Sequence, residues 1–347
     1  MDIIGGGIGG LAVAAALARD GRKVTVRERD EALPGTGTAL GMWPAALRAL
    51  DEIGAGDAVR RAGRRQEAGA FLRPDGSRIV TLDMARLHRR TGDHVYLISR
   101  PRLLAILHRA ALDAGAEVRF GDPVDEAADR VIVADGVFSR TRDRLLGHAF
   151  RARYSGSTAW RGVLPGLPTS TFSEVWGRGV KFGVTPHEAG STNWFATSAV
   201  PEGMFHPGQE VAALHRIFGG WAPPVRPVLD AIEESGVLRH DIFVTPPLPS
   251  YICGSSVLIG DAAHAMPPDL GRGACEAIID AVTLAACLRQ ATTWEKGLHA
   301  YDRKRRPVTQ RLARMAGLAA RMTRMRHGIP VRDGLLKVGM LAGPPAV

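Results

Sequence analysis

The chain has 347 residues, of which 45% are hydrophobic and 23% charged, a composition that suits one or two globular domains with a real core. Its formal net charge is +10, but the arginines are spread along the chain and no nucleic-acid-binding motif accompanies them, which argues against a nucleic-acid partner. We interpret the densest basic stretch, residues 301–332, as the solvated face of a helix near the C-terminus.

The cysteines and the apolar N-terminal stretch indicate the cellular compartment and the relation to membranes. Cys253, Cys275 and Cys287 show neither CxxC nor metal-ligand spacing, so we expect no disulfide framework, no metal site and a reducing, cytoplasmic environment. The apolar stretch 3–18 is too short to span a bilayer, is rich in glycine and has no basic leader. We therefore expect no stable membrane insertion, and either a monomer or a homodimer.

The first 28 residues predict a βαβ unit. A short strand at 2–4 is followed by a glycine turn, by an alanine-rich helix at 11–19 that Gly21 ends, and by a strand at 23–28. Two later apolar runs, 131–135 and 257–261, have the continuous pattern of central strands buried on both faces. We predict an α/β fold whose Rossmann-like domain contains a parallel sheet and binds its ligand at the strand ends.

A second region has a different pattern. Residues 68–97 and 151–250 hold most of the aromatic residues and many prolines without a long helical period, which predicts one antiparallel sheet inserted twice. C-terminal helices are expected at 274–290 and 295–327. The predicted division is a nucleotide-binding domain of residues 1–67, 98–150 and 251–327, a substrate domain of residues 68–97 and 151–250, and a C-terminal tail of residues 328–347.

The run Gly5–Gly10 satisfies the GxGxxG pattern. Its first glycine permits a tight turn, its second lets the backbone approach a pyrophosphate, and its third lets helix and strand pack closely. The helix N-terminus then offers free N–H groups to phosphates. Glu28 ends the second strand, where its carboxylate either binds a ribose diol or is a plain exposed charge. In the first case it would repel a 2′-phosphate, which favours FAD or NAD.

Two further motifs follow strands. One is Asp135-Gly136 at the end of the run 131–135, and the other is the segment 260–274, in which a strand delivers Asp261 to the sheet edge before a loop opens a helix. That order suits a ribityl hydroxyl on Asp261 and the pyrimidine edge of a flavin at the helix N-terminus.

The three motifs in this order resemble the flavoprotein aromatic hydroxylases of the p-hydroxybenzoate hydroxylase type (class A flavoprotein monooxygenases), most closely the branch with FAD-dependent urate hydroxylases and zeaxanthin epoxidases. The resemblance covers most of the chain, including residues 41–47 and Trp160-Arg161. It implies an enzyme that uses FAD, with NADPH or NADH as transient reductant. Such an enzyme inserts one oxygen atom of O2 into a small aromatic or secondary-metabolite substrate through a flavin C4a-hydroperoxide.

The resemblance also implies site residues. The expected FAD-binding residues are Gly5, Gly7, Ile8, Gly9, Gly10, Glu28, Arg29, Arg100, Asp135, Gly260, Asp261, Pro268, Gly271, Arg272, Gly273 and Ala274. The candidate substrate-pocket residues are Met42, Arg161, Trp176, Phe182, Trp194 and Pro267. No catalytic side chain is assigned, because the flavin carries the chemistry. The aromatic residues could equally be sheet core, and Arg161 half of a structural ion pair; we interpret His264 as a structural histidine satisfied by backbone and His187 as a turn residue.

Some residues depart from the family pattern. Arg272 replaces the usual glutamine, Asp269 the usual asparagine and Ile279 the usual glutamate, so we expect Arg272 and Asp269 to pair with each other or to touch the substrate. Three alternatives stay open: a flavin-binding accessory protein without turnover, an epoxidase, and a Baeyer–Villiger enzyme. A halogenase is disfavoured because residues 160–165 do not match WxWxIP, and an NAD-dependent dehydrogenase because it would not explain the Asp261 motif.

The purified protein is predicted to be yellow and to hold FAD without a covalent bond, because no histidine or cysteine stands at an obvious attachment position. Acid precipitation should release the flavin into the supernatant, where its absorbance spectrum and mass identify it. A colourless protein that cannot be reconstituted with FAD would contradict the prediction.

Overall fold

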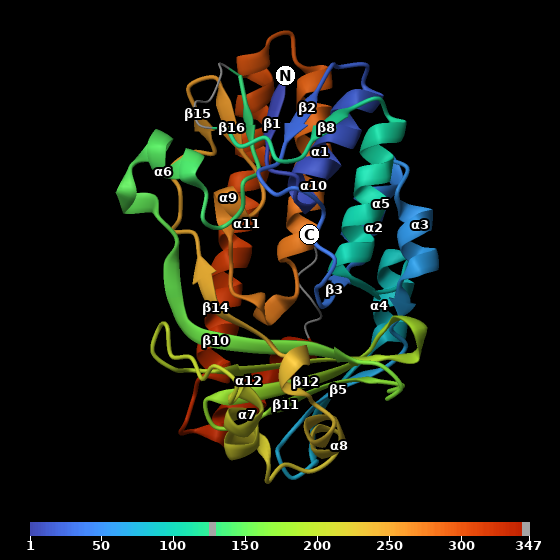
Figure 1. Cartoon of the computed structure of the whole chain (residues 1–347), viewed down its shortest axis with the longest axis vertical. Helices are drawn as coiled ribbons and strands as arrows, with labels where there is room; N and C mark the ends of the chain where they lie inside the picture. The colour runs from blue at the N-terminus through green and yellow to red at the C-terminus, as the bar shows by residue number, and fades with distance from the viewer. Residues whose placement is uncertain (125–129, 342–347) are drawn as a thin grey trace.

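The computed structural model describes residues 1–124 and 130–341 and shows a mixed α/β protein with two main sheets (Figure 1). A six-stranded sheet lies in the upper part of Figure 1, and a seven-stranded sheet lies across the lower part. The long helix α11 (Trp294–Thr323) runs from the upper region toward the lower one. The predicted fold class, a Rossmann-like domain with an antiparallel sheet and C-terminal helices, is confirmed.

The six-stranded sheet is parallel except at one edge. Its strand order is β15 (Ile252–Cys253), β16 (Ser256–Leu258), β9 (Ile132–Val133), β1 (Asp2–Ile4), β2 (Thr25–Arg27) and β8 (Glu117–Arg119). Only β15 runs antiparallel, to β16. Because β1, β9 and β16 are parallel neighbours, the three motifs that follow them meet at one edge of the sheet, the position where open α/β sheets bind ligands.

The predicted βαβ unit is confirmed. Helix α1 (Ile8–Arg19) begins three residues earlier than predicted, and Gly21 follows it with a φ of +77°, in the region that glycine adopts without strain. Almost every residue of α1 is buried, because the helix packs against both α5 (Arg100–Asp113) and α10 (Gly273–Gln290). Its small alanine side chains let the neighbouring helices approach closely.

The seven-stranded sheet forms the second layer. Its order is β14 (Leu238–Val244), β10 (Arg153–Leu164), β13 (Thr192–Ser198), β12 (Val180–Pro186), β11 (Phe172–Trp176), β5 (Gly69–Leu72) and β6 (Arg78–Leu82). All neighbours are antiparallel except β5 and β11. The outer face is covered by α7 (Glu210–Phe218) and α8 (Val225–Asp230), below the sheet in Figure 1. The sequence did not predict these helices, because nine and six residues show too few turns for a clear period.

The segment 68–97 does not enter this sheet as a whole, and that prediction was wrong. Only β5 and β6 join it. Residues 84–91 form helix α4 (Met84–Thr91), and β7 (Tyr96–Ser99) pairs with β3 (Ala39–Met42) and β4 (Arg64–Arg65) in a separate three-stranded sheet. Helix α4 has only eight residues, too few for a clear helical period in the sequence.

The C-terminal region is also helical. The helices predicted at 274–290 and 295–327 are confirmed as α10 and α11, and part of the predicted tail forms α12 (Ile329–Leu341), which packs against β6. The rest of that tail, residues 342–347, lies outside the described residues. The remaining helices are α2 (Pro44–Glu52), α3 (Gly56–Ala62), α6 (Arg140–Leu146) and α9 (Asp261–His264). Within residues 1–124 and 130–341, no helix has both the length and the apolar character needed to cross a bilayer.

A buried ionic network joins α10 and α11 to the end of β16. The Asp280 carboxylate accepts a 2.9 Å bond from the Gly260 backbone N–H and lies 2.6 Å from His264 Nε2 and 2.6 Å from Arg305 Nε. Arg305 also donates a 2.6 Å bond to Glu276 Oε2. Burial alone raises the pKa of Asp280, but His264 and Arg305 lower this pKa to about 2. His264 is therefore structural as predicted, although its ring contacts the carboxylate of Asp280 and not backbone.

Arg305→Met should destabilise the protein strongly, because it leaves the carboxylates of Glu276 and Asp280 buried without their shared cation. Breaking a buried ion pair in this way costs about 3–5 kcal/mol. Urea unfolding at a fixed, saturating FAD concentration measures the loss. The matched control is Arg303→Met on the exposed side of the same helix, expected to change stability by less than about 0.5 kcal/mol. Equal losses in the two variants would mean that the network contributes nothing specific.

Candidate active site

A cavity of about 670 Å³ lies where the two main sheets face each other. Its wall on the side of the six-stranded sheet includes Gly7, Gly260 and Asp261, which follow the strand ends. Its opposite wall includes Lys181 of β12 and Phe195 of β13. One continuous space therefore joins the predicted cofactor site to the second sheet.

The glycine loop has the shape that a dinucleotide site needs. A Cβ on Gly10 would lie 1.9 Å from the carbonyl oxygen of Gly5, so only glycine permits this contact between helix and strand. Gly5 has a φ of +103°, and a Cβ there would lie 2.5 Å from the carbonyl oxygen of Ala134. A Cβ on Gly7 would meet nothing within 4 Å, which leaves open space for a ligand beside the backbone.

Several polar groups at the cofactor end lack protein partners. Neither α1 nor α10 has a side-chain N-cap, so their first backbone N–H groups are free for a ligand. Gly7 to Gly9 line the cavity at the first of these helix ends, and Gly273 and Ala274 line it at the second. Asp135 Oδ1 is enclosed and has no hydrogen-bond partner among the described residues, and Asp135 does not line the cavity, although Ala134 and Gly136 on either side of it do. The free N–H donors of the two helix ends fit the phosphates and the ring edge of FAD.

Asp261 is free to contact a ligand. It is the first residue of α9 and lines the cavity, and no described residue donates a hydrogen bond to its carboxylate; the N-cap is Gly260 without a capping side chain. Asp261 is therefore not a helix cap, and its side chain is exposed to the cavity. Gly260 itself has a φ of +58°, which favours glycine at this turn.

Two arginines line the same cavity, and neither is paired with an acidic side chain of the described residues. Arg100 and Arg161 both line it, and among residues 1–124 and 130–341 neither forms an ion pair. Burial lowers the pKa of Arg161, and the positive charge of Arg100 lowers it further. Two roles were expected for Arg161, binding of an anion or a structural ion pair. Among the described residues Arg161 has no ion-pair partner, so binding of an anion is the role that stays open.

Glu28 and Arg29 lie outside the cavity lining. The Glu28 carboxylate accepts bonds from the backbone N–H groups of Gly6 and Asp30, so it braces the glycine loop. The Arg29 side chain is 69% exposed and lies 3.7 Å from Asp30. A role for either residue in contacting the adenosine half of FAD stays a prediction.

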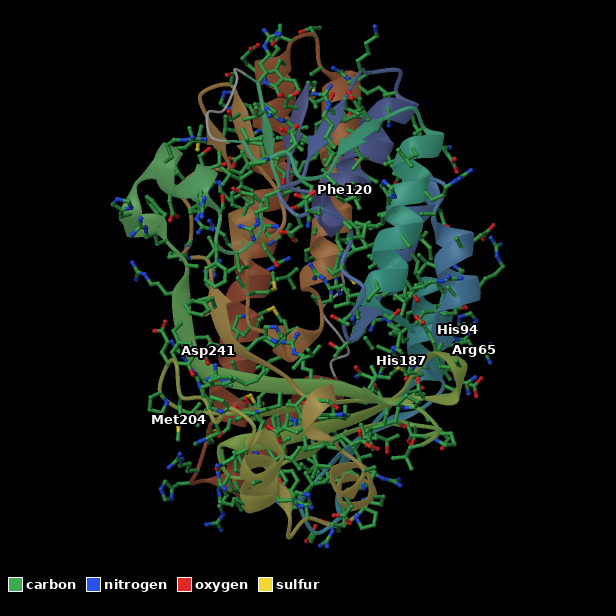
Figure 2. All side chains as sticks on the ribbon, in the orientation of Figure 1. Arg65, His94, Phe120, His187, Met204 and Asp241 are labelled. Carbon is green, nitrogen blue, oxygen red and sulfur yellow. The ribbon has the colours of Figure 1, made fainter. Side chains whose placement is uncertain are left out.

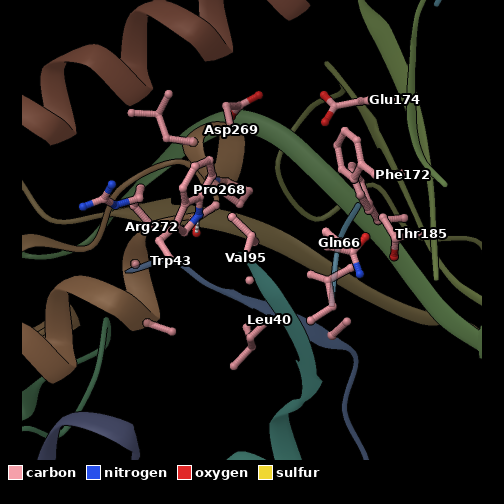
Figure 3. Close-up of a pocket in the computed structure, with 18 of the residues that line it drawn as sticks. Leu40, Trp43, Gln66, Val95, Phe172, Glu174, Thr185, Pro268, Asp269 and Arg272 are labelled. Carbon is pink, nitrogen blue, oxygen red and sulfur yellow. Dashed lines mark hydrogen bonds between the residues drawn. The ribbon is translucent and has the colours of Figure 1, made fainter. Parts of the chain in front are cut away.

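The two departures from the family pattern have separate partners. Arg272 pairs with Glu276 at 2.8 Å and lies over the Trp43 ring at 5.8 Å, and Figure 3 shows its guanidinium pointing away from Glu174. Asp269 pairs with Lys181 at 3.0 Å. The predicted mutual pair of Arg272 and Asp269 is wrong. Both residues nevertheless line the cavity, together with Pro268 and Gly271.

Most of the predicted substrate-pocket residues do not reach the cavity. Phe182 and Trp194 are buried under α7 and α8, Met42 is buried in the core of the first domain, and Trp176 packs with Leu336 of α12. Pro267 does not line the cavity, whereas its neighbours on both sides do. Of this set only Arg161 lines it.

The error has a simple cause, because adjacent residues of a strand point to opposite faces. In β12 and β13, the residues that face the cavity are Lys181, Thr185, Asn193, Phe195 and Thr197. Both faces of the sheet are covered, so apolar character alone could not show which face meets the cavity. A charged residue between Val180 and Phe182 was the signal that could have identified it. His187, a turn residue as predicted, lies away from this face, between β12 and a short 3-10 helix (Figure 2).

The fold and the cavity define a flavin-dependent oxidoreductase, and comparisons with known proteins agree. The family described as "FAD binding domain" matches residues 1–155 and 248–316, and the chain belongs to it. The chain is similar to aurachin C monooxygenase/isomerase of Stigmatella aurantiaca, with 37% identity over 306 residues, 82% of this chain and 79% of the relative.

Two further similarities bear on the site. The 2-heptyl-3-hydroxy-4(1H)-quinolone synthase of Mycobacteroides abscessus is 32% identical over 337 residues, 89% of this chain and 87% of the relative. The crystal structure of HpxO of Klebsiella pneumoniae, complexed with FAD and uric acid, superposes with a TM-score of 0.88 and 28% identity, covering 98% of this chain and 92% of that one. The chain is an FAD-dependent monooxygenase.

Asp261→Ala should weaken FAD binding while the apoprotein still folds, because the carboxylate is exposed to the cavity and accepts no hydrogen bond from a described residue. Its loss removes a hydrogen bond to a ligand, worth about 1.5–3 kcal/mol when one partner is charged. The measurement is the rise in melting temperature on adding saturating FAD, since a ligand stabilises only the state that binds it.

The rise should be much smaller in the variant than in wild type, and the melting temperatures of the two apoproteins should be similar. The matched control is Asp113→Ala at the exposed end of α5, outside the cavity lining. An equal gain from FAD in wild type and Asp261→Ala would remove Asp261 from the site.

Proposed function

We propose that this monooxygenase hydroxylates an electron-rich nitrogen heteroaromatic ring that carries an apolar substituent. The single observation behind the proposal is the continuity of the cavity, which extends from the glycine loop into an apolar chamber. The chamber is lined by apolar side chains from β3, β5, β6, α4, β7, β11 and α12 and from the residue before β7: Leu40, Phe71, Val80, Leu82, Met84, Leu87, Val95, Leu97, Phe172 and Met340. Figure 3 shows Leu40, Val95 and Phe172 bordering this space.

The relatives support the same substrate class. The relative from Mycobacteroides abscessus is named for a 4(1H)-quinolone with a heptyl chain, and HpxO was crystallised with uric acid. Both molecules contain planar nitrogen heterocycles. A ring of this kind fits beside the cofactor end of the cavity, and a hydrocarbon chain fits the apolar chamber, where burial of each CH2 group contributes about 0.8 kcal/mol.

The protein's own residues would bind and orient the two reactants. We propose that the N–H groups at the start of α1 hold the FAD pyrophosphate, that Asp261 and Arg100 contact the ribityl and phosphate region, and that Gly273 and Ala274 hold the ring edge. Bound FAD supplies the redox chemistry, accepting electrons from NADPH or NADH and activating dioxygen. The apolar lining excludes water from the reaction, which protects a reactive oxidant from being wasted.

The setting of the enzyme follows from its cysteines. We infer a reducing compartment such as the cytoplasm, because Cys253, Cys275 and Cys287 are all free thiols and two of them are buried. Burial raises the pKa of Cys275 to about 11, so this thiol stays protonated and unreactive at neutral pH. A monomer or homodimer remains our proposal for the assembly.

The test is turnover by the FAD-loaded protein. Uric acid and 2-heptyl-4(1H)-quinolone are each added with NADPH or NADH under isotopically labelled dioxygen. A substrate of the proposed class should accelerate NAD(P)H oxidation at least about tenfold and yield a product with one labelled oxygen atom. Asp261→Ala, which retains less FAD, is the matched low-activity control.

Failure of both compounds to stimulate NAD(P)H oxidation, in protein that holds a full complement of FAD, would contradict the proposed substrate class. Epoxide or ring-expanded products would instead contradict hydroxylation, and the position of the labelled oxygen in the product distinguishes these outcomes.

A further inference from the structure

Three charged side chains lie together in the wall of the cavity. Lys181 Nζ is 2.9 Å from Glu174 Oε1 and 3.0 Å from Asp269 Oδ1, and all three residues line the cavity. Their side chains are less than 10% exposed. Figure 3 shows the carboxylates of Glu174 and Asp269 pointing toward one another across the space beside Phe172. We name these three residues the acidic triad.

The charges of the acidic triad do not balance. Burial lowers the pKa of Lys181, but Asp269 and Glu174 outweigh this effect and raise it above its usual value, so the ammonium stays protonated. One cation between two carboxylates leaves a net charge of −1. Taking a net charge out of water is costly unless another polar group compensates for it. The other described residues that donate hydrogen bonds to these carboxylates, Trp176 and Thr323, are neutral.

Each carboxylate also keeps one oxygen free. The bonds from Trp176 Nε1 and Lys181 reach Glu174 Oε1, and those from Thr323 and Lys181 reach Asp269 Oδ1. No described residue donates a hydrogen bond to Glu174 Oε2 or to Asp269 Oδ2. Neither oxygen atom is fully enclosed by protein. Both oxygens therefore have access to the cavity and can accept hydrogen bonds from a molecule inside it.

We propose that Glu174 Oε2 and Asp269 Oδ2 form a subsite for a neutral N–H donor on the substrate ring, such as a lactam or quinolone N–H. This inference rests on the proposed function and names the group by which the substrate is recognised. Lys181 is a positioning residue that holds the two acceptors in place. A carboxylate-bearing substrate would be repelled by the net negative charge, whereas an N–H group can donate its hydrogen bond to either free oxygen.

The subsite lies close to the cofactor end. Asp269 belongs to the segment 268–274, whose last residues begin α10 at the proposed flavin edge. A ring bound through its N–H to the acidic triad would therefore lie beside that segment. Its substituent could extend toward the apolar chamber, on whose border Phe172 lies next to Glu174.

The experiment compares probes with and without the donor. Binding of 2-heptyl-4(1H)-quinolone and of its N-methylated derivative is measured from the change in the absorbance of the oxidised, FAD-loaded enzyme. Wild type should bind the N–H probe at least about tenfold more tightly than its N-methyl partner. In Glu174→Gln and in Asp269→Asn, the affinity for that N–H probe should fall about tenfold, because a charge-assisted bond becomes a neutral one. The affinity for the N-methyl partner should change less than about twofold.

Both variants preserve side-chain shape and leave Lys181 paired with the remaining carboxylate. The matched control is Glu52→Gln, an exposed residue of α2, which should change neither affinity. Equal weakening of both probes would show a purely structural role, and it would overturn the subsite. Equal affinity of wild type for the N–H probe and its N-methyl partner, or no binding of the N–H probe, would overturn it too. Turnover is measured separately, so failure of the subsite and failure of the proposed function are distinguishable.

Discussion

The arrangement of the active site depends on one buried carboxylate. Asp280 accepts the backbone N–H of Gly260, lies against His264 and binds Arg305, so a single side chain joins the end of β16 to α10 and α11. Because all these partners are buried, the carboxylate must remain ionised and fully bonded for the fold to tolerate it. The turn that presents Asp261 to the cavity is held in place by this network.

The cofactor and substrate ends of the cavity are built by different means. At the cofactor end, backbone groups are the main donors: Gly5 and Gly10 have no room for a Cβ, Gly7 leaves open space beside the backbone, and two helices begin there without caps. Recognition through backbone N–H groups requires only that the strands end at a common edge. At the substrate end, side chains of β11, β12 and β13 form the wall, so its chemistry can change by substitution without disturbing the cofactor end.

The two ends also differ in charge. Arg100, at the start of α5, lines the cavity without an acid partner among the described residues, whereas the acidic triad carries a net charge of −1. The negative phosphates of a dinucleotide are attracted to Arg100 and a neutral ring donor to the acidic triad, while Arg161 of β10 adds an unpaired positive charge to the wall formed by the second sheet. The overall charge of +10 therefore does not describe the part of the cavity next to Glu174.

Sequence alone determined the features that depend on local chain geometry. Neighbouring residues alone form the glycine turn Gly5 to Gly10, the alanine-rich helix and the apolar strands before Asp135 and Asp261. The order of these motifs, which resembles that of flavoprotein aromatic hydroxylases, was enough to predict the fold class and FAD. Only the tertiary structure decided which face of β12 and β13 meets the cavity, because helices cover the other face and both faces hold large apolar residues. It also decided that Asp269 pairs with Lys181 and Arg272 with Glu276, since these choices depend on how distant elements pack and on where each buried charge finds its nearest opposite charge.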